Sequence, residues 1–524
     1  MTPFQEFRLW SRRAPMGQRV TAAVAAVVAL SALGWMLVPA GAQTASNSGS
    51  PGSQAQSGAS GAGASGSGAG PSATATTQTV AGGAQGATGG PTGGPGGAAG
   101  GAAGAAASRT GATGGATASS HCTSPPGSAQ GVTSTQIKIA VLLVNIAGAA
   151  GNQTFGVASP QQQQTADQAV IDNINTSGGV ACRKLAPQFF TGNPVDSNSL
   201  QQACLAVAQA GVFAVIDLGA FANFPNVSCF AQNHIPYFGG NNFAASLVNQ
   251  FYPYIFDFGT LDAVYKDTVF GLQKDGFFSP TNGFKKLGII YRDCYPKIFS
   301  EETGWLSQAG VAPSNIVTYD VGCPSALASP SDIENAVLKF QQAGVTNVTT
   351  IDELGDFAAF TNVAQAQNFH PKYGLADDDL LQIAGGAEAP NSSNIVGAIA
   401  VTSQRQGEQN TAGLTPTAGT ARCNAIMQPT GLGPVYQQPG GMGGDVCDLF
   451  WMFAAATDHA PAIAQNALAN GLEASGSVDF SFPEGPNNFA GTGVTVGGQF
   501  YRIDQFSGAC KCWQVIQPNF QPNF

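Results

Sequence analysis

The stretch QIKIAVLLVNIAGAAGNQTFGVASPQQQQTADQAVIDNIN, residues 136–175, changes from an apolar to a polar pattern across one short loop. Its first part, 137–144, is an almost continuous apolar run, which is typical of a strand buried on both faces of a sheet. The pair Ser159-Pro160 then indicates a helix start, with serine as N-cap and proline at the first helical position. A buried strand, a glycine-containing loop and a capped helix form the first half of a βαβ unit, so we expect the ordered protein to begin near residue 134.

Strand-like and helical runs continue to alternate along the chain, in two series. The first series continues with apolar runs near 185–191, 212–219, 235–240 and 254–259. The second comprises KKLGIIYRD (285–293), NIVTYDVG (315–322), VTNVTTID (345–352), LLQIAGG (380–386) and IVGAIAV (395–401). Strands that alternate with helices predict parallel sheets covered on both faces, and two series predict two sheets. The expected fold class is therefore α/β, with two doubly wound, Rossmann-like lobes.

The two lobes are expected to exchange chain segments. Helical runs near 445–459 and 462–472 follow the second series, and short extended segments follow them, so the chain must cross back between the lobes. We therefore expect lobe 1 to comprise residues 134–257 and 402–478, and lobe 2 to comprise residues 258–401 and 479–524. In open parallel sheets, ligands bind outside the carboxyl ends of the strands, which predicts a ligand cleft between the lobes.

Residues 1–42 have the layout of an export signal. Arginines precede the uncharged run 20–38, and a stretch of small residues ends at Ala42. As a helix at ~1.5 Å per residue that run is about 28 Å long, close to the ~30 Å hydrocarbon thickness of a bilayer. The segment is thus either a signal peptide or an uncleaved membrane anchor. Residues 43–133, rich in Gly, Ala and Ser, are expected to form a disordered linker. The predicted location is extracytoplasmic, secreted or at the cell surface, with a membrane tether.

The composition excludes several classes of function. Only 10% of the residues are charged, the net charge is −10 and no basic cluster follows the N-terminus, which argues against a nucleic-acid partner. The sequence contains no G-x-S-x-G, H-E-x-x-H or Walker A motif, so we do not expect an enzyme. The four histidines are scattered and no cysteine pair has C-x-x-C spacing, so neither a metal site nor a cofactor is expected.

The order of the predicted strands and two later segments resemble a known family. The return helix GGDVCDLFWMFAAATDHA (443–460) and the ending SVDFSFPEGPNNFAGTGVTVGGQFYRID (477–504) are similar to those of type I periplasmic binding proteins, in the branched-chain amino-acid and amide-binding branch that serves ABC importers. In this family two hinged lobes close on a small solute and present it to a permease. The resemblance implies a solute-binding protein that captures a small polar or amino-acid-like ligand for an ABC permease and catalyses nothing.

A cell-surface ligand-sensing or interaction domain on the same fold is the alternative. Many tethered receptors of ABC importers carry a lipidated cysteine directly after the signal, whereas this chain has no cysteine before Cys122. Fold alone does not determine function, so this alternative stays open at the level of sequence.

The resemblance also implies which loops of lobe 1 meet the ligand. In amino-acid binders these loops carry small hydroxyl residues and backbone N–H groups that hold a carboxylate. Phe221 and the Asn241-Asn242 pair replace that pattern, and their ring and amide groups suit a neutral or partly aromatic solute. Alternatively, the two asparagines only form a turn. The expected ligand-binding residues of lobe 1 are Gly219, Ala220, Phe221, Gly240, Asn241 and Asn242.

Lobe 2 is expected to contribute acidic and aromatic residues to the same cleft. By position these are Tyr295, Asp352, Glu353 and Glu388. In related amino-acid binders an acidic residue in the last of these loops meets the ammonium group of the ligand, and a carboxylate in a closed cleft favours a cationic or amino group. Acidic residues at strand ends also serve as helix N-caps, which is the alternative for each of them.

All ten cysteines lie at or beyond Cys122 in a chain that we expect to be exported, so disulfides are predicted. The resemblance implies a bond between Cys182 and Cys204, analogous to one in branched-chain amino-acid binders. The cysteines Cys294 and Cys323 follow neighbouring strands, and Cys423 and Cys447 flank a Gly- and Pro-rich loop, so each of these pairs is expected to be bonded. The remaining cysteines are Cys122, Cys229, Cys510 and Cys512, of which the last two are not expected to pair with each other.

Overall fold

The structure is a computed structural model. It describes residues 124–146, 148–154, 157–194, 196–217, 219, 227–240, 242–292, 296–322, 328–351, 356–377, 391–405, 410–414, 416–432, 446–491 and 495–524. All of these residues belong to one compact unit, Arg109–Phe524. The predicted signal or anchor and residues 43–123 of the predicted linker lie outside the described residues. No helix within the described part of the chain is long and apolar enough to cross a membrane.

Residues 124–133, the end of the predicted linker, belong to the folded domain. The N–H of Ile463 donates to the carbonyl of Pro126 at 2.8 Å, and the N–H of Lys138 donates to the carbonyl of Gly131 at 2.7 Å. Gly131 has a φ of 78°, and a Cβ at this position would lie 2.4 Å from the backbone nitrogen of Phe213. The domain thus begins before residue 134, because backbone contacts hold a segment that has few apolar side chains.

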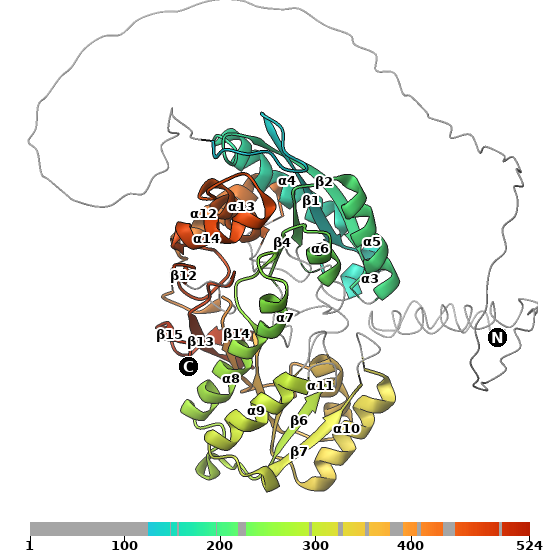
Figure 1. Ribbon diagram of the computed structural model, residues 1–524. Helices are drawn as coiled ribbons and strands as arrows, with labels where there is room; N and C mark the ends of the chain where they lie inside the picture. Colours follow the sequence, from blue (N-terminus) through green and yellow to red (C-terminus); the bar gives the residue numbers. More distant parts are fainter. Residues whose placement is uncertain are drawn as a thin grey trace, which may run out of the picture. The chain divides into compact units, whose positions relative to one another are not determined.

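The first sheet contains five parallel strands in the order β2-β1-β3-β4-β5 (Figure 1). Alternate residues of β1 face opposite sides, as expected of a strand buried on both faces. Ile139 and Val141 join one hydrophobic core, whereas Ala140 and Leu142 join the other. The strands are β1 (Gln136–Val144), β2 (Lys184–Gly192), β3 (Ala214–Asp217), β4 (Tyr237–Gly239) and β5 (Ile255–Phe256).

Helices cover both faces of this sheet. Ser159 caps α4 (Pro160–Thr176) as predicted, because its hydroxyl accepts the N–H of Gln162 while the Gln162 side chain accepts the N–H of Ser159. The opposite core is built with α5 (Ser197–Ala210) and two short helices, α6 (Ser228–Gln232) and α7 (Ala245–Gln250). A further short helix, α3 (Gly148–Thr154), follows β1.

The second sheet has the order β14-β13-β10-β9-β8-β6-β7, and β15 pairs with β13. Strands β6 to β10 pair in parallel, whereas β13 to β15 are antiparallel. The strands are β6 (Leu287–Tyr291), β7 (Ile316–Asp320), β8 (Asn347–Ile351), β9 (Lys372–Leu375), β10 (Ile399–Thr402), β13 (Phe500–Ser507), β14 (Cys512–Val515) and β15 (Gln521–Pro522).

Helices α8 (Leu261–Lys274) and α9 (Pro296–Gln308) cover one face of the second sheet, and α10 (Pro330–Ala343) and α11 (Asp356–Ala366) cover the other. Two doubly wound α/β sheets confirm the predicted fold class. One strand was not predicted: β9 lies at 372–375. The expected strand at 380–386 lies outside the described residues.

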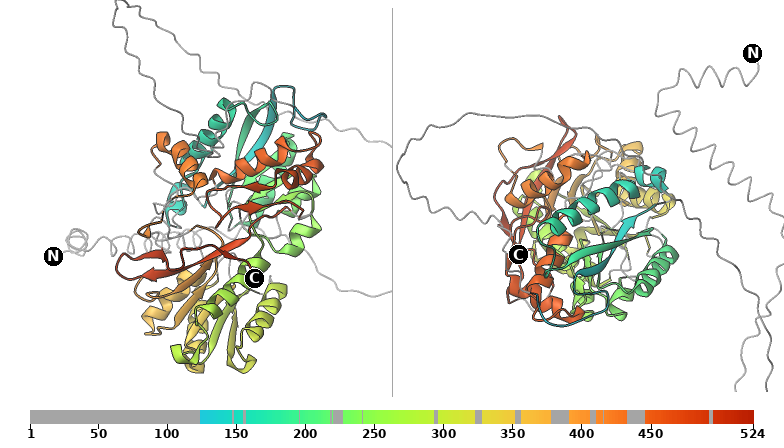
Figure 2. Two further views of the ribbon diagram at one scale, coloured as in Figure 1. Left: turned by 90° about the vertical axis from the view of Figure 1, so that its left-hand side faces the viewer. Right: turned by 90° about the horizontal axis from the view of Figure 1, so that it is seen from above.

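Late parts of the chain return to both sheets. Three helices, α12 (Ala418–Met427), α13 (Asp448–Asp458) and α14 (Leu468–Ser475), contribute to the same core as β1 and α4. In Figures 1 and 2 these orange helices lie beside the blue-green elements of the first sheet. Strand β13 then completes the second sheet. The remaining short elements are η1 (Pro280–Asn282), η2 (Pro313–Asn315), η5 (Gln428–Thr430), η7 (Gln465–Ala467), β11 (Ser477–Val478) and β12 (Asn487–Asn488).

The disulfides agree only in part with the expected pairs. Cys423 and Cys447 are bonded, as predicted. The predicted Cys182–Cys204 pair is wrong, because Cys204 faces the core shared with α6 and is bonded there to Cys229. Cys182 is also disulfide-bonded.

The expectation that Cys510 and Cys512 pair elsewhere is wrong as well. The tight connection between β13 and β14 brings them together, and they form a disulfide with each other. Cys122, Cys294 and Cys323 lie outside the described residues.

Candidate functional site

Three of the ten predicted ligand residues are described, and they lie at the carboxyl ends of β3 and β4. Asp217 of β3 pairs with Gly239 of β4, so Gly219 and Gly240, which follow these strands, lie at the same edge of the sheet. This is the edge at which parallel sheets bind ligands. The other seven residues lie outside the described residues: Ala220, Phe221, Asn241, Tyr295, Asp352, Glu353 and Glu388.

Asn242 is buried and packs against the segment that leaves the first sheet. It is 2% exposed and has a φ of 52°. A Cβ on Gly259 would lie 2.8 Å from Asn242 Oδ1, so this amide lies directly over the backbone of Gly259. Asparagine tolerates a left-handed conformation better than most residues. The geometry of Asn242 favours the turn interpretation of this residue over direct contact with a solute.

Two buried side chains that the sequence analysis missed fix the end of β1. Gln163 Oε1 accepts the N–H of Val144 at 2.8 Å, and Gln163 Nε2 donates to the carbonyl of the same residue at 2.9 Å. Asn152 Nδ2 donates to the carbonyls of Val144 at 2.8 Å and Ala158 at 2.7 Å. These side chains therefore provide hydrogen-bond partners for the backbone N–H and carbonyl of Val144 at the carboxyl end of the strand. Gln163 is one of four consecutive glutamines, so its role has no local signal in the sequence.

A buried ion pair organises the corresponding edge of the second sheet. Arg292 directly follows β6, and its Nη2 bonds to Asp356 Oδ2 at the start of α11. Arg292 Nη1 also donates to the carbonyl of Gly322, just beyond β7, at 3.3 Å. Asp356 Oδ1 accepts the N–H of Ala328 at 2.8 Å. One ion pair therefore joins the bases of several loops on this edge. The sequence signal for this pair is an arginine directly after a buried strand in a charge-poor chain.

Three segments carry the chain between the two sheets: 257–260, 403–405 and 495–499. We name these three segments the crossing segments. The first and third run side by side, since the N–H of Asp257 donates to the carbonyl of Thr495 at 3.0 Å and the N–H of Gly498 donates to the carbonyl of Phe258 at 2.6 Å.

Segment 482–484 lies beside the second crossing segment, before residues 487–489 return to the core of the first lobe. The N–H of Arg405 donates to the carbonyl of Phe482 at 2.6 Å, and the N–H of Glu484 donates to the carbonyl of Ser403 at 2.7 Å. Arg405 Nε also donates to the carbonyl of Pro483 at 2.8 Å.

A cavity of about 90 Å³ lies between the crossing segments and α8. Phe258, Thr260, Asp267, Ser403 and Asn523 are among the residues that line it. Asp267 is 2% exposed; its Oδ1 accepts the N–H of Phe524 at 2.8 Å, while its Oδ2 has no hydrogen-bond partner in the described part of the chain. Burial raises the pKa of Asp267 to about 7.

A second buried carboxyl group lies beside the crossing segments. Asp377 follows β9, and its Oδ2 accepts the N–H of Ser403 at 2.8 Å as well as the hydroxyl of the same residue. Burial raises the pKa of Asp377 to about 7, and its charge also raises the pKa of Asp267. Two acids that titrate near neutral pH therefore lie where the chain passes between the sheets.

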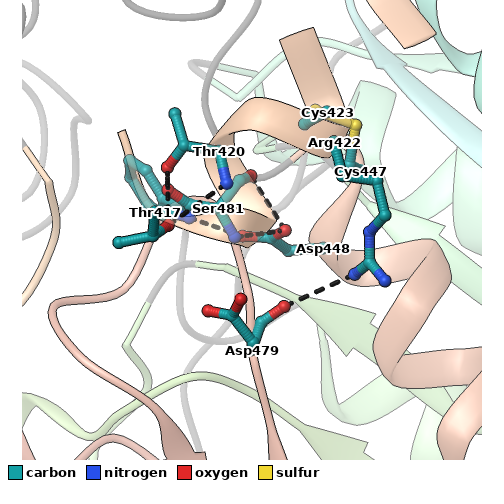
Figure 3. The surroundings of a disulfide bond; sticks show 9 residues. Thr417, Thr420, Arg422, Cys423, Cys447, Asp448, Asp479 and Ser481 are labelled. Atoms are coloured by element: carbon teal, nitrogen blue, oxygen red, sulfur yellow. Dashed lines mark hydrogen bonds between the residues drawn. A yellow bond between two sulfur atoms is a disulfide. The ribbon is translucent and has the colours of Figure 1, made fainter. Parts of the chain in front are cut away.

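The segment that lies beside 403–405 is anchored at its start to α13 (Figure 3). Asp448, in the first turn of α13, accepts hydrogen bonds from the N–H of Ser481 and of Phe482. The preceding residue, Cys447, is bonded to Cys423 of α12. The disulfide thus joins α12 to the start of α13, the helix that anchors this segment. None of the described residues form a group of three or more His, Cys, Asp or Glu that could hold a metal ion.

Comparisons with known proteins agree with this architecture. The family model described as "Periplasmic binding protein" matches residues 136–503. No curated protein matches the chain significantly.

Several solved structures share the fold. A fatty acid ABC transporter substrate-binding protein from Thermomonospora curvata superposes with a TM-score of 0.54 at 14% identity, over 77% of this chain and 96% of that chain. A branched-chain amino acid transporter substrate-binding protein from Streptococcus pneumoniae, in complex with isoleucine, gives 0.53 at 14% identity, over 73% and 100%. A solute-binding protein of an ABC transporter from Rhodopseudomonas palustris, in complex with 3,4-dihydroxybenzoic acid, gives 0.51 at 14% identity, over 74% and 97%. With the family model matching most of its length and both lobes built around parallel strands and joined by three crossing segments, the chain belongs to the periplasmic binding protein family and is a solute-binding protein.

Proposed function

We propose that this protein captures a small polar or amino-acid-like solute between its lobes and delivers it to an ABC importer. The observation that carries this proposal is the set of three crossing segments, which join the two α/β sheets. Such a connection lets the lobes close on a solute and open again without breaking either core. The proposed role is binding and release, without catalysis.

The proposed ligand contacts come from loops at the carboxyl ends of the strands of both sheets. Gly219 and Gly240 offer backbone groups at one edge, and Arg292 with Asp356 orders the loops of the other edge. In lobe 1, one loop carries the aromatic ring of Phe221 and the other carries the amide of Asn241, and the loops of lobe 2 carry acids. Together these groups suit a solute with an amino group and an apolar or aromatic part. The proposed contact residues are Gly219, Ala220, Phe221, Gly240, Asn241, Tyr295, Asp352, Glu353 and Glu388, with Asn242 shaping the loop.

Solute binding can be tested by calorimetric titration of the full chain with amino acids, their amides and aromatic carboxylic acids. We expect at least one of these compounds to bind, and Glu388→Gln to weaken a ligand that carries an amino group by about tenfold or more, the effect of losing a charged hydrogen bond. Glu334→Gln is the matched control, because Glu334 is exposed on α10 and is not one of the proposed contacts. Equal affinities of the wild type and Glu388→Gln would remove Glu388 from the site.

We further propose that residues 1–42 direct export and that the chain remains attached to the membrane through them, with residues 43–123 as spacer. The apolar run 20–38 and the Gly-, Ala- and Ser-rich composition support this proposal. Fractionation followed by N-terminal sequencing tests it. A membrane-bound species that retains residues 1–42 is expected, whereas a soluble species beginning after Ala42 would show a cleaved signal instead.

A further inference from the structure

The hairpin between β13 and β14 carries an exposed disulfide that solute binding does not explain. Cys510 and Cys512 are bonded across a single intervening residue, Lys511. Cys510 and Lys511 are exposed, and Cys512 is half-buried at the start of β14. Lys511 has a φ of 54°, so the backbone turns sharply between the two sulfur-bearing residues.

This disulfide differs from the other two whose partners are both described. Cys204, Cys423 and Cys447 are completely buried and Cys229 is half-buried, and their bonds span 25 and 24 positions of the chain. Bonds of that kind stabilise a fold by closing long loops, and buried sulfur atoms are shielded from external thiols. The Cys510–Cys512 bond closes almost no loop and is open to solvent.

The hairpin is also closed without the disulfide. Ser507 pairs with Cys512 and Phe506 pairs with Trp513 in the antiparallel ladder of β13 and β14. The rings of Phe506 and Trp513 pack edge to face, with centroids 5.4 Å apart. Asn410 Nδ2 donates to the carbonyl of Trp513 at 3.2 Å, which further holds the strand in place. The hairpin is therefore held by strand pairing and ring packing, so the disulfide is not required to close it.

We propose that Cys510–Cys512 is a redox-active modification site that exchanges with low-molecular-weight thiols. A thiolate RS⁻ attacks the exposed Cys510 sulfur, an R–S–Sγ bond forms, the Sγ–Sγ bond breaks, and the electron pair leaves on Cys512 as thiolate. Attack by the Cys512 thiolate reverses the step and releases RS⁻. Attack by a second RS⁻ on the sulfur of R instead releases the disulfide RSSR and leaves the reduced Cys510–Cys512 dithiol.

Lys511 gives this site a preference among thiols. Its exposed ammonium group lies between the two cysteines, and the surrounding residues 507–513, SGACKCW, contain no carboxylate. A positive charge attracts an anionic thiol and stabilises the thiolate that leaves. The site should therefore react faster with glutathione, which carries net negative charge, than with a neutral thiol of similar reactivity.

The test is timed reduction of the oxidised full-length protein with glutathione, with alkylation of free thiols and peptide mapping at each time point. Cys510 and Cys512 should be alkylated at least about tenfold faster than Cys204, Cys423 and Cys447, with a glutathione adduct on Cys510, because exposed disulfides exchange more readily than buried ones. Reduction of all the bonds at a common rate, or of Cys423–Cys447 first, would overturn the proposal.

Two variants separate a reactive site from an ordinary surface disulfide. Lys511→Glu should slow exchange with glutathione more than exchange with 2-mercaptoethanol, whereas the control Lys285→Glu, at another exposed lysine, should change neither rate. Equal slowing of both reagents by Lys511→Glu would contradict the role of Lys511.

The double variant Cys510→Ser/Cys512→Ser should keep the melting temperature and the solute affinity of the wild type. A drop in melting temperature equal to that of Cys423→Ser/Cys447→Ser would show a structural bond and overturn the proposal.

Discussion

The carboxylate of Asp448 holds Ser481, 33 residues later in the chain, by two kinds of hydrogen bond. Asp448 Oδ1 accepts the N–H of Ser481 at 2.8 Å and its hydroxyl at 2.9 Å. Both residues are completely buried. Because Ser481 directly precedes segment 482–484, which lies beside the second crossing segment, this contact ties that segment to helix α13 of the first lobe.

Asp448→Asn should lower the free energy of unfolding by about 1.5–3 kcal/mol, the range for charged hydrogen bonds. The substitution replaces one acceptor oxygen by an NH2 group, which cannot accept a hydrogen bond from an N–H group. Urea unfolding of the full chain measures the loss. The control is Asp172→Asn, because Asp172 is exposed on α4 and should be nearly neutral. A loss for Asp448→Asn no larger than that for Asp172→Asn would mean that this anchor is dispensable.

The ion pair of Arg292 and Asp356 predicts a strongly coupled double substitution. Removing one partner leaves a buried charge, so Arg292→Met and Asp356→Leu should each destabilise the protein by about 3–5 kcal/mol. The double variant Arg292→Met/Asp356→Leu should be more stable than either single variant, because no unpaired charge remains. A double-mutant cycle by urea unfolding checks this, and additive losses would show that the two groups act independently.

Asp267 and Asp377 predict a pH dependence of stability. The folded-state pKa of each is about 7, above the ordinary value of 3.8, so the folded protein binds more protons than the unfolded chain between these values. The free energy of unfolding should therefore fall as the pH rises from about 4 to about 7, and this contribution should level off above pH 7.

Asp267→Asn and Asp377→Asn should each flatten that pH profile, because an amide does not titrate in this range. Asn at 267 can still accept the N–H of Phe524, which limits the loss of structure. Urea unfolding at a series of pH values gives the slopes for the wild type and both variants. Unchanged slopes in both variants would place the two carboxyl groups in a less desolvated environment than the structure shows.

The sequence predicted the features of the fold that depend on local pattern. The apolar run of β1 and the capping residues Ser159 and Gln162 are neighbours in the chain, so their signal is contained in a few residues. Strand β9 gave no such signal, because only four residues, Lys372–Leu375, form it and a proline directly precedes it. Its position is set by pairing with β8 and β10, which is information from distant parts of the chain.

The features of the site that the sequence did not predict also depend on contacts between distant parts of the chain. Gln163 acts through the backbone of Val144, and Asn242 contacts Gly259, so the role of each depends on how separate elements pack. The partner of Cys204 depends on which face of α5 turns toward α6, a choice that the resemblance to other binding proteins did not fix. The positions of Gly219 and Gly240 at one edge of the first sheet were predictable because parallel strands bring their carboxyl ends to the same edge.

The central claim, capture of a small solute between two lobes, is tested most directly by native mass spectrometry of the freshly purified full chain. We predict a species heavier than the protein by one small molecule, which is released on unfolding and is then identified by its mass. The same solute should rebind to the stripped wild type and to Glu334→Gln, but only weakly to Tyr295→Ala and Glu388→Gln. A protein that carries no solute and binds none of the amino acids, amides or aromatic acids, or a solute whose affinity is unchanged in both cleft variants, would contradict the account.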